Sequence, residues 1–291
     1  MSNPAPLSNP NGVLYILATP IGNYADISAR AIEILKTVQL IVVEDTRHSG
    51  KLLKHLGIRN KMQALHDHNE ANLAPQIIEQ VKNGQQIALI SDAGTPLISD
   101  PGFKLVRLAQ QQQLQVVPIP GPSALITALS VSGLATDKFC FEGFLSSKQQ
   151  SRRSQLASYL NEPRTLIFYE APHRLLSCLK DMVDIFGYEH QIVIARELTK
   201  TFETIKKGSL RTLVSWVEAD PDQQKGEIVL LVEGFKVAAK TEAQLGLSPQ
   251  TENILTSLLK ELTLKQAVSL TVNITGEKKK AIYQRALELK N

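Results

Sequence analysis

Cysteine and aromatic residues are scarce in this chain of 291 residues. The two cysteines, Cys140 and Cys178, form no Cys-x-x-Cys pair, so the sequence indicates neither a disulfide framework nor a structural zinc site. Aromatic residues make up 5% of the chain and give no signal of base-stacking platforms. No stretch approaches about 18 consecutive apolar residues, and the segment before Leu14 has no basic start or apolar core. We therefore expect a reduced, cytoplasmic protein with no signal peptide and no membrane span.

Several common motifs of nucleotide chemistry are also missing. The chain contains no G-x-x-x-x-G-K-[ST], no G-x-G-x-x-G after its first strand and no H-E-x-x-H. These absences disfavour nucleotide hydrolysis and nicotinamide chemistry. His66-Asp67-His68 has an H-x-H pattern, but no third ligand stands at a recognisable spacing, so we expect no metal. The net charge of +4, from 32 basic and 28 acidic residues, permits a polyanionic partner without requiring one.

Short apolar runs alternate with helix-like segments along most of the chain. Seven runs rich in β-branched residues end in polar or glycine-rich breaks, at 14–23, 40–48, 86–96, 114–124, 165–174, 191–200 and 226–234. Between most of them lie segments with helical periodicity, such as ISARAIEILKTV and HRLLSCLKDMVDIFG. This pattern predicts an α/β protein with mainly parallel sheets.

Composition divides the chain into four parts. We expect a flexible N-terminus at 1–12, an N-terminal α/β domain at 13–120, a second α/β domain at 121–236 and a small helical domain at 248–291. The proline-rich PIPGPSALITAL marks the boundary between the two α/β domains, which implies a cleft between them.

Three short helices are predicted in the last part of the chain. Ser248 with Pro249 is typical of a helix start, Thr263 to Gln266 fits a capping box, and Thr275 or Gly276 would open the last helix. The pattern resembles a helix-turn-helix unit with a basic patch at Lys278, Lys279 and Lys280. A helical tail that packs on the body or on a partner subunit is the alternative.

Polar residues gather where the predicted strands end, the edge at which α/β proteins bind ligands. The densest segment is SDAGTPLISDPG at 91–102, which either holds backbone and carboxylates close to a ligand or caps the helix that follows. The first loop, TPIGN, has a single glycine and is either part of this site or a plain proline turn. Glu44 to Arg47, and Tyr169-Glu170 with His173-Arg174, place acids beside bases, as functional groups or as ion pairs at helix starts.

Together these motifs resemble the tetrapyrrole-methylase superfamily of S-adenosylmethionine-dependent methyltransferases, and within it the ribosomal RNA small subunit methyltransferase I group. The resemblance runs from about Leu14 to Gly234 through LYILATPIGN, VVEDTRHSGKLL, ALHDHNE, SDAGTPLISDPG, PGPSALITAL, GFLSSKQQSRR, TLIFYEAPHR, ARELTKTFET and KGEIVLLVEG. The C-terminal segment is similar to the short helical domain of this group. TPIGN stands where porphyrinoid methylases usually have a G-x-G-x-G-D-like turn, which favours the RNA branch.

The resemblance implies two α/β domains of the tetrapyrrole-methylase type with S-adenosylmethionine in the cleft between them, usually in a homodimer. It implies 2'-O-methylation of a cytidine ribose in 16S rRNA of the small ribosomal subunit, near the decoding centre. The cofactor positions that it implies are Thr19, Pro20, Asp92, Ala93, Gly94, Thr95, Pro96, Ser123, Ala124, Phe168, Tyr169, Glu197, Leu198 and Glu227.

The reaction needs alignment of a ribose hydroxyl, and a nearby base would take its proton. We expect Asp45 or Glu170 to be this catalytic base and no metal to be required. We expect the RNA to contact Arg47, Arg152, Arg153, Arg174, Lys278, Lys279 and Lys280. The alternatives are a methylase of a small tetrapyrrole-like acceptor and a non-catalytic RNA-binding assembly factor on the same fold.

Overall fold

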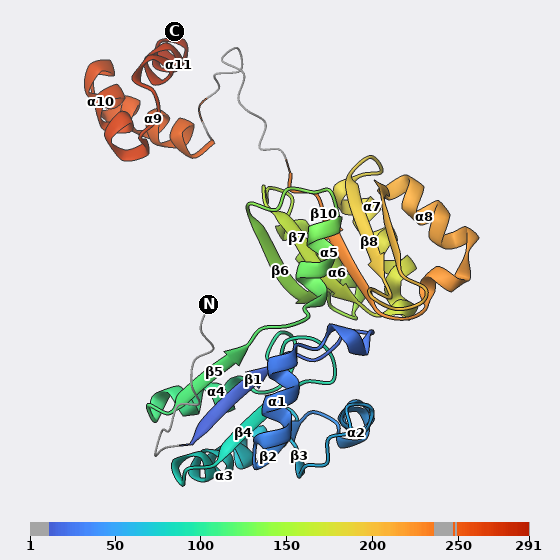
Figure 1. Ribbon diagram of the computed structural model, residues 1–291. Coiled ribbons are helices and arrows are strands. Elements are labelled where there is room, and N and C mark those ends of the chain that lie inside the picture. The colour runs from blue at the N-terminus through green and yellow to red at the C-terminus, as the bar shows by residue number, and fades with distance from the viewer. Residues whose placement is uncertain (1–11, 236–246, 248, 291) are drawn as a thin grey trace. The chain divides into compact units, whose positions relative to one another are not determined.

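The computed structural model describes residues 12–235, 247 and 249–290 (Figure 1). The chain divides into two compact units, Met1–Phe235 and Lys236–Asn291, which are treated separately below. Residues 1–11 of the expected flexible N-terminus, and Ser248 of the expected helix start, lie outside the described residues.

The first half of the larger unit is a five-stranded sheet with helices on both faces. All its neighbouring strands are parallel, in the order β3-β2-β4-β1-β5. The strands are β1 (Val13–Leu17), β2 (Leu40–Val43), β3 (Met62–Ala64), β4 (Gln86–Ile90) and β5 (Gln115–Ile119). The helical elements are η1 (Tyr24–Asp26), α1 (Ala29–Thr37), α2 (Thr46–His55), α3 (Glu70–Lys82) and α4 (Phe103–Gln111). Because both faces are covered, β2 is apolar and buried at all four positions.

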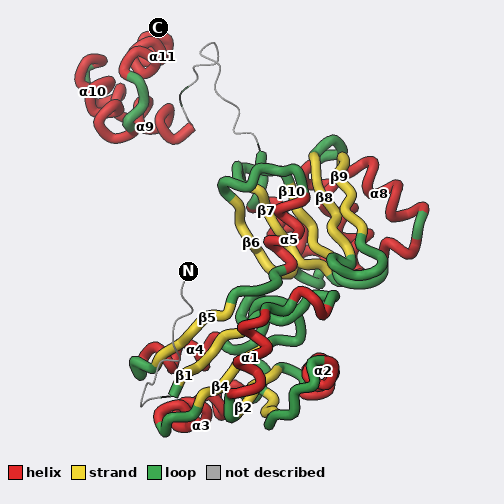
Figure 2. Tube along the Cα trace, viewed as in Figure 1, coloured by secondary structure: helices red, strands yellow, loops and turns green. Residues whose placement is uncertain are grey.

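The second half of the larger unit is another five-stranded sheet, in the order β6-β7-β10-β8-β9. Its strands are β6 (Phe139–Phe144), β7 (Thr165–Glu170), β8 (Gln191–Arg196), β9 (Thr204–Ser209) and β10 (Ile228–Val232). Its helical elements are α5 (Ala124–Val131), α6 (Gln149–Ser158), η2 (Pro172–Arg174), α7 (Leu175–Phe186), α8 (Leu210–Ala219) and η3 (Pro221–Gln224). Helix and strand therefore alternate through most of both halves, and the predicted α/β class is confirmed (Figure 2).

The prediction of mainly parallel sheets is wrong for this second sheet. Only β6 and β7 are parallel, whereas β10 is antiparallel to both of its neighbours and β8 is antiparallel to β9. The connection from β8 to β9 is too short to hold a crossover helix, so the chain turns back on itself instead. The sequence pattern of alternating elements does not reveal this change of direction.

Side chains of β7 alternate between two different cores. Phe168 is fully buried against Leu156, Leu179 and their neighbours on the face that α6, α7 and α8 cover. Ile167 and Tyr169 point to the opposite face, which α5 covers and which faces the first half of the unit. This alternation of period two decides which residues of the strand reach the site described below.

The C-terminal unit consists of α9 (Pro249–Glu261), α10 (Leu264–Thr275) and α11 (Lys279–Lys290) around its own core of Leu247, Leu255, Ala267, Val268, Ile282 and Ala286. The predicted capping box is confirmed, with Thr263 and Gln266 capping α10. Gly276 does not open the last helix, because it ends α10 in the left-handed conformation at a φ of 69°. Among the described helices, none has the length and apolar character that a membrane crossing requires.

Candidate functional site

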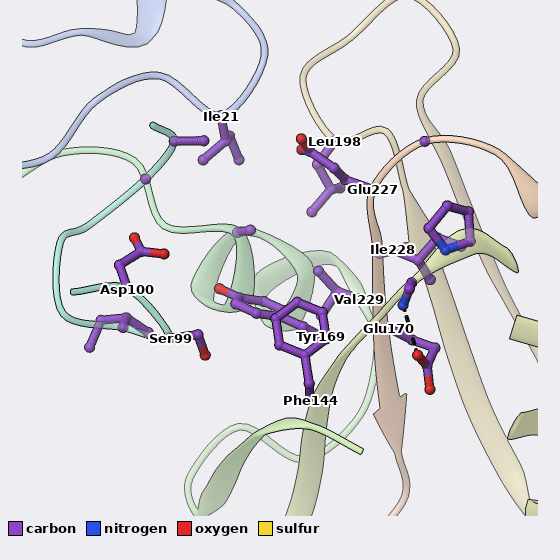
Figure 3. A pocket seen from close by; sticks show the side chains of 18 residues that line it. Ile21, Ser99, Asp100, Phe144, Tyr169, Glu170, Leu198, Glu227, Ile228 and Val229 are labelled. Carbon is purple, nitrogen blue, oxygen red and sulfur yellow. Dashed lines mark hydrogen bonds between the residues drawn. The ribbon is translucent and has the colours of Figure 1, made fainter. Parts of the chain in front are cut away.

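A pocket of about 340 Å³ lies between the loops of the two sheets in the larger unit (Figure 3). The first half contributes Ile21 after β1, and Ala93, Gly94, Ile98, Ser99 and Asp100 after β4. The second half contributes Phe144, Tyr169, Leu198, Glu227 and Val229, among others. The pocket is therefore at the carboxyl ends of β1, β4 and β7, the edge at which open α/β sheets bind ligands.

Six of the predicted cofactor residues line this pocket. They are Ala93, Gly94, Ala124, Tyr169, Leu198 and Glu227. Tyr169 is partly buried, and its phenol points toward the loop that carries Asp100 (Figure 3). Burial, with a smaller contribution from the charge of Asp100, raises the pKa of Tyr169 to about 12. Tyr169 is therefore a neutral hydrogen-bonding group on the pocket wall at physiological pH.

Other predicted cofactor residues do not line the pocket, and Thr19 and Thr95 form hydrogen bonds that connect the loops around it. Thr19 is buried, exchanges backbone hydrogen bonds of 2.8 and 3.0 Å with Gly94, and donates from its hydroxyl to the carbonyl of Ser91. The hydroxyl of Thr95 donates to the carbonyl of Pro122 at 3.0 Å, which ties the loop after β4 to the segment that precedes α5. Pro20, Asp92 and Ser123 are also outside the pocket lining, each next to a residue that forms it, and Pro96 lies between the lining residues Gly94 and Ile98.

Phe168 and Glu197 do not face the pocket. Phe168 is fully buried in the core on the opposite side of β7, so its side chain does not reach the pocket. Glu197 supports the loop before β10, because its carboxylate accepts from the backbone N–H of Glu227 at 2.9 Å and from Lys200 at 2.7 Å. Gly226 has a φ of +81°, which favours glycine, and a Cβ there would also approach the Glu197 carboxyl carbon to 2.4 Å and displace that carboxylate.

Neither residue expected to be the base has its carboxylate in the pocket. Asp45 caps α2, accepting from the backbone and the guanidinium of Arg47, and these bonds lower its pKa to about 2. Glu170 is buried, and its side chain points away from Tyr169 (Figure 3). Its carboxylate accepts from Arg174 at 2.7 Å. Glu170 contributes to the lining of the pocket at the end of β7, but its acidic group serves an ion pair.

Asp100 lines the pocket from the loop after β4, within the predicted ligand segment 91–102, although it is not among the predicted cofactor or catalytic residues. Burial raises its pKa to about 6, and the charges of Glu44 and Asp92 act in the same direction, while the Ser91 hydroxyl opposes them. Burial and the nearby carboxylates of Asp92, Asp67 and Asp45 also raise the pKa of Glu44. The motif SDAGTPLISDPG contains Asp100 as its second aspartate, but the cofactor positions that the resemblance implies in this loop end at Pro96.

Strained backbone surrounds the pocket on two sides. Five non-glycine residues among those described have positive φ, and four of them are Leu97, Ser99, Glu197 and Thr199. Leu97 and Ser99 flank Ile98, whereas Glu197 and Thr199 flank Leu198, and both central residues line the pocket. Such conformations persist only where the surroundings enforce them, and they concentrate at functional sites.

The predicted RNA-binding residues separate into two groups. Arg47, with 89% of its side chain exposed, and Lys278, Lys279 and Lys280 are on the surface. Arg152 is buried in an ion pair of 2.7 Å with Asp181, so the prediction that it contacts RNA is wrong in this structure. Arg174 is paired with Glu170, and Arg153 is paired with Asp181 and Asp184. These three arginines stabilise the second half of the unit.

Within the described part of the chain, no group of three or more His, Cys, Asp or Glu is arranged to hold a metal ion. The rings of His66 and His68 lie edge to face, with centroids 6.0 Å apart, on an exposed loop.

Comparison with known proteins agrees with this architecture. Residues 13–214 match the family model of the tetrapyrrole (corrin/porphyrin) methylases, and residues 246–290 match that of the RsmI C-terminal HTH domain. The chain is 52% identical to "Ribosomal RNA small subunit methyltransferase I" of Pseudomonas aeruginosa, over 95% of this chain and 97% of that protein. It is 51% identical to the protein of the same name from Escherichia coli O157:H7, over 96% of each.

Solved structures share the fold at low sequence identity. A uroporphyrin-III-C-methyltransferase from Thermus thermophilus is 17% identical, with a TM-score of 0.55 over 76% of this chain and 94% of that one. The methyltransferase CobJ is 16% identical, with a TM-score of 0.58 over 77% of this chain and 94% of that one. The chain belongs to the tetrapyrrole methylase family and, within it, to the family of ribosomal RNA small subunit methyltransferase I.

Proposed function

We propose that this protein is an S-adenosylmethionine-dependent methyltransferase that modifies the 2'-hydroxyl of a cytidine ribose in 16S rRNA, near the decoding centre. The observation that carries the proposal is the pocket between the two sheets, on a chain about half identical over nearly its full length to proteins named as small subunit rRNA methyltransferases. The pocket is lined by the segments that carry the family resemblance.

The character of the pocket fits S-adenosylmethionine. Ile21, Leu198 and Val229 supply apolar walls, while Asp100 and Glu227 supply carboxylates, which favour a cationic ligand. When bound, this cofactor supplies a methyl group carried on a sulfonium cation. We propose that the loop Ala93–Asp100 and the segment Gly226–Val229 hold the cofactor from opposite sides, and that Tyr169 and Phe144 pack against it.

We propose that Asp100 takes the proton of the acceptor hydroxyl, in place of Asp45 or Glu170. A pKa of about 6 leaves Asp100 largely ionised at neutral pH and still basic enough to accept a proton. Asp45 is a weaker base because its hydrogen bonds to Arg47 lower its pKa, and Glu170 faces the other side of β7. The strained residues Leu97 and Ser99 hold the loop that presents Asp100.

The test is transfer of a radiolabelled methyl group from S-adenosylmethionine to small ribosomal subunits that lack modifications. Nuclease digestion and mass spectrometry then locate the label. A single 2'-O-methylated cytidine is the expected result. Label on another position or on a small tetrapyrrole would contradict the proposed acceptor, and failure to bind S-adenosylmethionine would contradict the methyltransferase proposal itself. The homodimer and the cytoplasmic location remain predictions, which light scattering and cell fractionation would check.

A further inference from the structure

One continuous segment has a higher net positive charge than the whole protein. Residues 46–66 contain five Lys or Arg, three His and no Asp or Glu, which gives a formal charge of +5 against +4 for the entire chain. The remaining 27 basic and 28 acidic residues nearly cancel. The excess of positive charge is therefore local, and α2 forms the first half of the segment that carries it.

Helix α2 exposes its own basic residues on its outer side. Arg47, His48, Lys51, Lys54 and His55, which we call the basic face of α2, are all exposed. The opposite side of the helix packs inward through Ser49, Leu52 and Leu53. Since ten helical residues span about 15 Å, the basic face is an elongated strip of positive charge.

The stability of the helix does not account for this strip. Lys54 and His55 stand in the last turn, where positive charge favours a helix, but Arg47 stands in the first turn, where it is unfavourable. Within the described part of the chain, Arg47 is the member of the basic face that forms an ion pair, with Asp45. The lysines at 51 and 54 have no acidic partner among the described residues and are available to an external anion.

An exposed aromatic side chain lies beside the strip. The ring of Tyr24 in η1 packs against His55 with a centroid distance of 4.4 Å, and Tyr24 is 42% exposed. A flat ring among cations is typical of surfaces that bind single-stranded nucleic acid, where phosphates meet Lys or Arg and a base stacks on the ring. The RNA acceptor of the proposed function supplies both the phosphates and the bases that such a surface would contact, and the test below separates RNA from an acidic protein.

The strip begins next to the pocket. Asp45 caps α2, and its backbone N–H donates to Asp92 at 3.3 Å, in the loop that continues to Asp100. Ile21 lines the pocket three residues before Tyr24. Asp100 lines the pocket, and the charges of Glu44 and Asp92 act on it. These carboxylates repel phosphates, whereas the basic face of α2 attracts them. This contrast of charge favours α2, rather than the surroundings of Asp100, as the place for a sugar-phosphate backbone.

We propose that the basic face of α2, together with Tyr24, is the docking surface for a single-stranded segment of the RNA substrate. Lys51, Lys54 and Arg47 contact phosphates, and the rings of Tyr24 and His55 form a platform for one base. The inference rests on the proposed function, because it assumes that the acceptor is RNA. It adds the surface that holds the RNA beside the pocket, which the family relationship does not assign.

The test compares two double variants of the full chain. Lys51→Gln with Lys54→Gln removes two charges from the basic face, and Lys104→Gln with Lys138→Gln removes two charges from exposed sites on α4 and before β6. Binding to an unmodified 16S rRNA transcript is measured over a range of salt concentrations, and S-adenosylmethionine binding is measured by calorimetry. We expect the α2 variant to bind RNA at least tenfold more weakly, with a logarithmic salt slope smaller by about 1.4. Its cofactor affinity should stay within twofold of the parent protein.

A second pair of variants tests the stacking platform. Tyr24→Ala should weaken RNA binding, and Tyr24→Phe should restore it, because stacking needs the ring and not the hydroxyl. Equal RNA affinity and salt slope in the two double variants would overturn the inference. So would an α2 variant that loses affinity for poly-glutamate but keeps its affinity for RNA, since that result indicates an acidic protein partner. Failure of the unaltered protein to methylate rRNA would instead count against the proposed function.

Discussion

At the scale of single residues, the direction of a side chain decides its role. Tyr169 and Glu170 are adjacent in β7, yet Tyr169 faces the pocket while the Glu170 carboxylate faces Arg174 on the other side. The two acids expected to be catalytic are engaged by arginines, whereas Asp100 and Glu227 line the pocket without an arginine partner among the described residues. The chemistry of the site therefore depends most on a residue whose pKa is raised to about 6 by burial and neighbouring acids.

Replacement of Asp100 by Asn should slow methyl transfer by about a hundredfold, because general bases typically contribute factors of this size. The single-turnover rate of the unaltered enzyme, with RNA and cofactor saturating, should rise with pH through about 6 and then level off, as Asp100 loses its proton. The variant should lack this rise. Rapid-quench measurements between pH 5 and 8 check both expectations.

The matched control for this variant is Asp45→Asn, which should stay within a few-fold of the parent rate. A measurement of stability shows whether a slow variant is also misfolded. Because the pKa of Asp100 is raised in the folded state, its protonation stabilises the fold below pH about 4, and this contribution is lost as pH rises through about 6. Asp100→Asn should therefore be at least as stable as the parent at pH 8, by urea denaturation. A variant rate within threefold of the parent would exclude Asp100 as the base.

At the scale of elements, buried charge joins α6 to α7. Arg152 on α6 and Asp181 on α7 have side chains 4% and 2% exposed and pair at 2.7 Å. Arg152→Met leaves Asp181 buried with weaker partners, so we expect a loss of roughly 3 kcal/mol in the free energy of unfolding. Arg153→Met, at a side chain that is 39% exposed, should cost less than about 1 kcal/mol.

Urea denaturation of the two variants measures this difference, and RNA binding should be unchanged in Arg152→Met at temperatures where it is folded. A selective loss of RNA affinity with full stability would restore the original expectation that Arg152 contacts phosphate. The pair shows why the dipeptide Arg152-Arg153 misleads at the level of sequence. Two neighbouring arginines on one helix have opposite exposure, which only the packing of α6 on α7 determines.

The sequence predicts the positions of most strands, because buried strands appear as short runs of β-branched residues such as LIVV in β2. It also predicts the glycine-rich and proline-rich loops that form the pocket, since their turn residues are local signals. It does not predict the antiparallel β10 or the inward direction of Phe168, which depend on strand partners far along the chain. Asp100 is present in the predicted loop, but its raised pKa arises first from burial and then from the charges of Glu44 and Asp92, and these surroundings exist only in the folded chain.

At the scale of the whole molecule, the chain is divided between a unit that contains the pocket and a helical unit with its own core. All residues that line the pocket lie before Phe235, and Leu255, Val268 and Ile282 form a separate core within the helical unit. Lys278, Lys279 and Lys280 are exposed at the start of α11, where positive charge adds to the positive end of the helix. The helical unit thus exposes three adjacent lysines, which we predict to contact RNA.

Deletion of residues 236–291 should therefore leave the pocket intact and weaken RNA binding. We expect cofactor affinity by calorimetry to stay within twofold, and affinity for small ribosomal subunits to fall at least tenfold. The full chain with Lys278, Lys279 and Lys280 all replaced by Gln is the matched control. It should lose up to about 2 units of logarithmic salt slope if all three lysines contact phosphates, because each contact to single-stranded RNA contributes about 0.7. Weaker cofactor binding after the deletion, with unchanged affinity for subunits, would instead show that the helical unit packs on the body and supports the pocket.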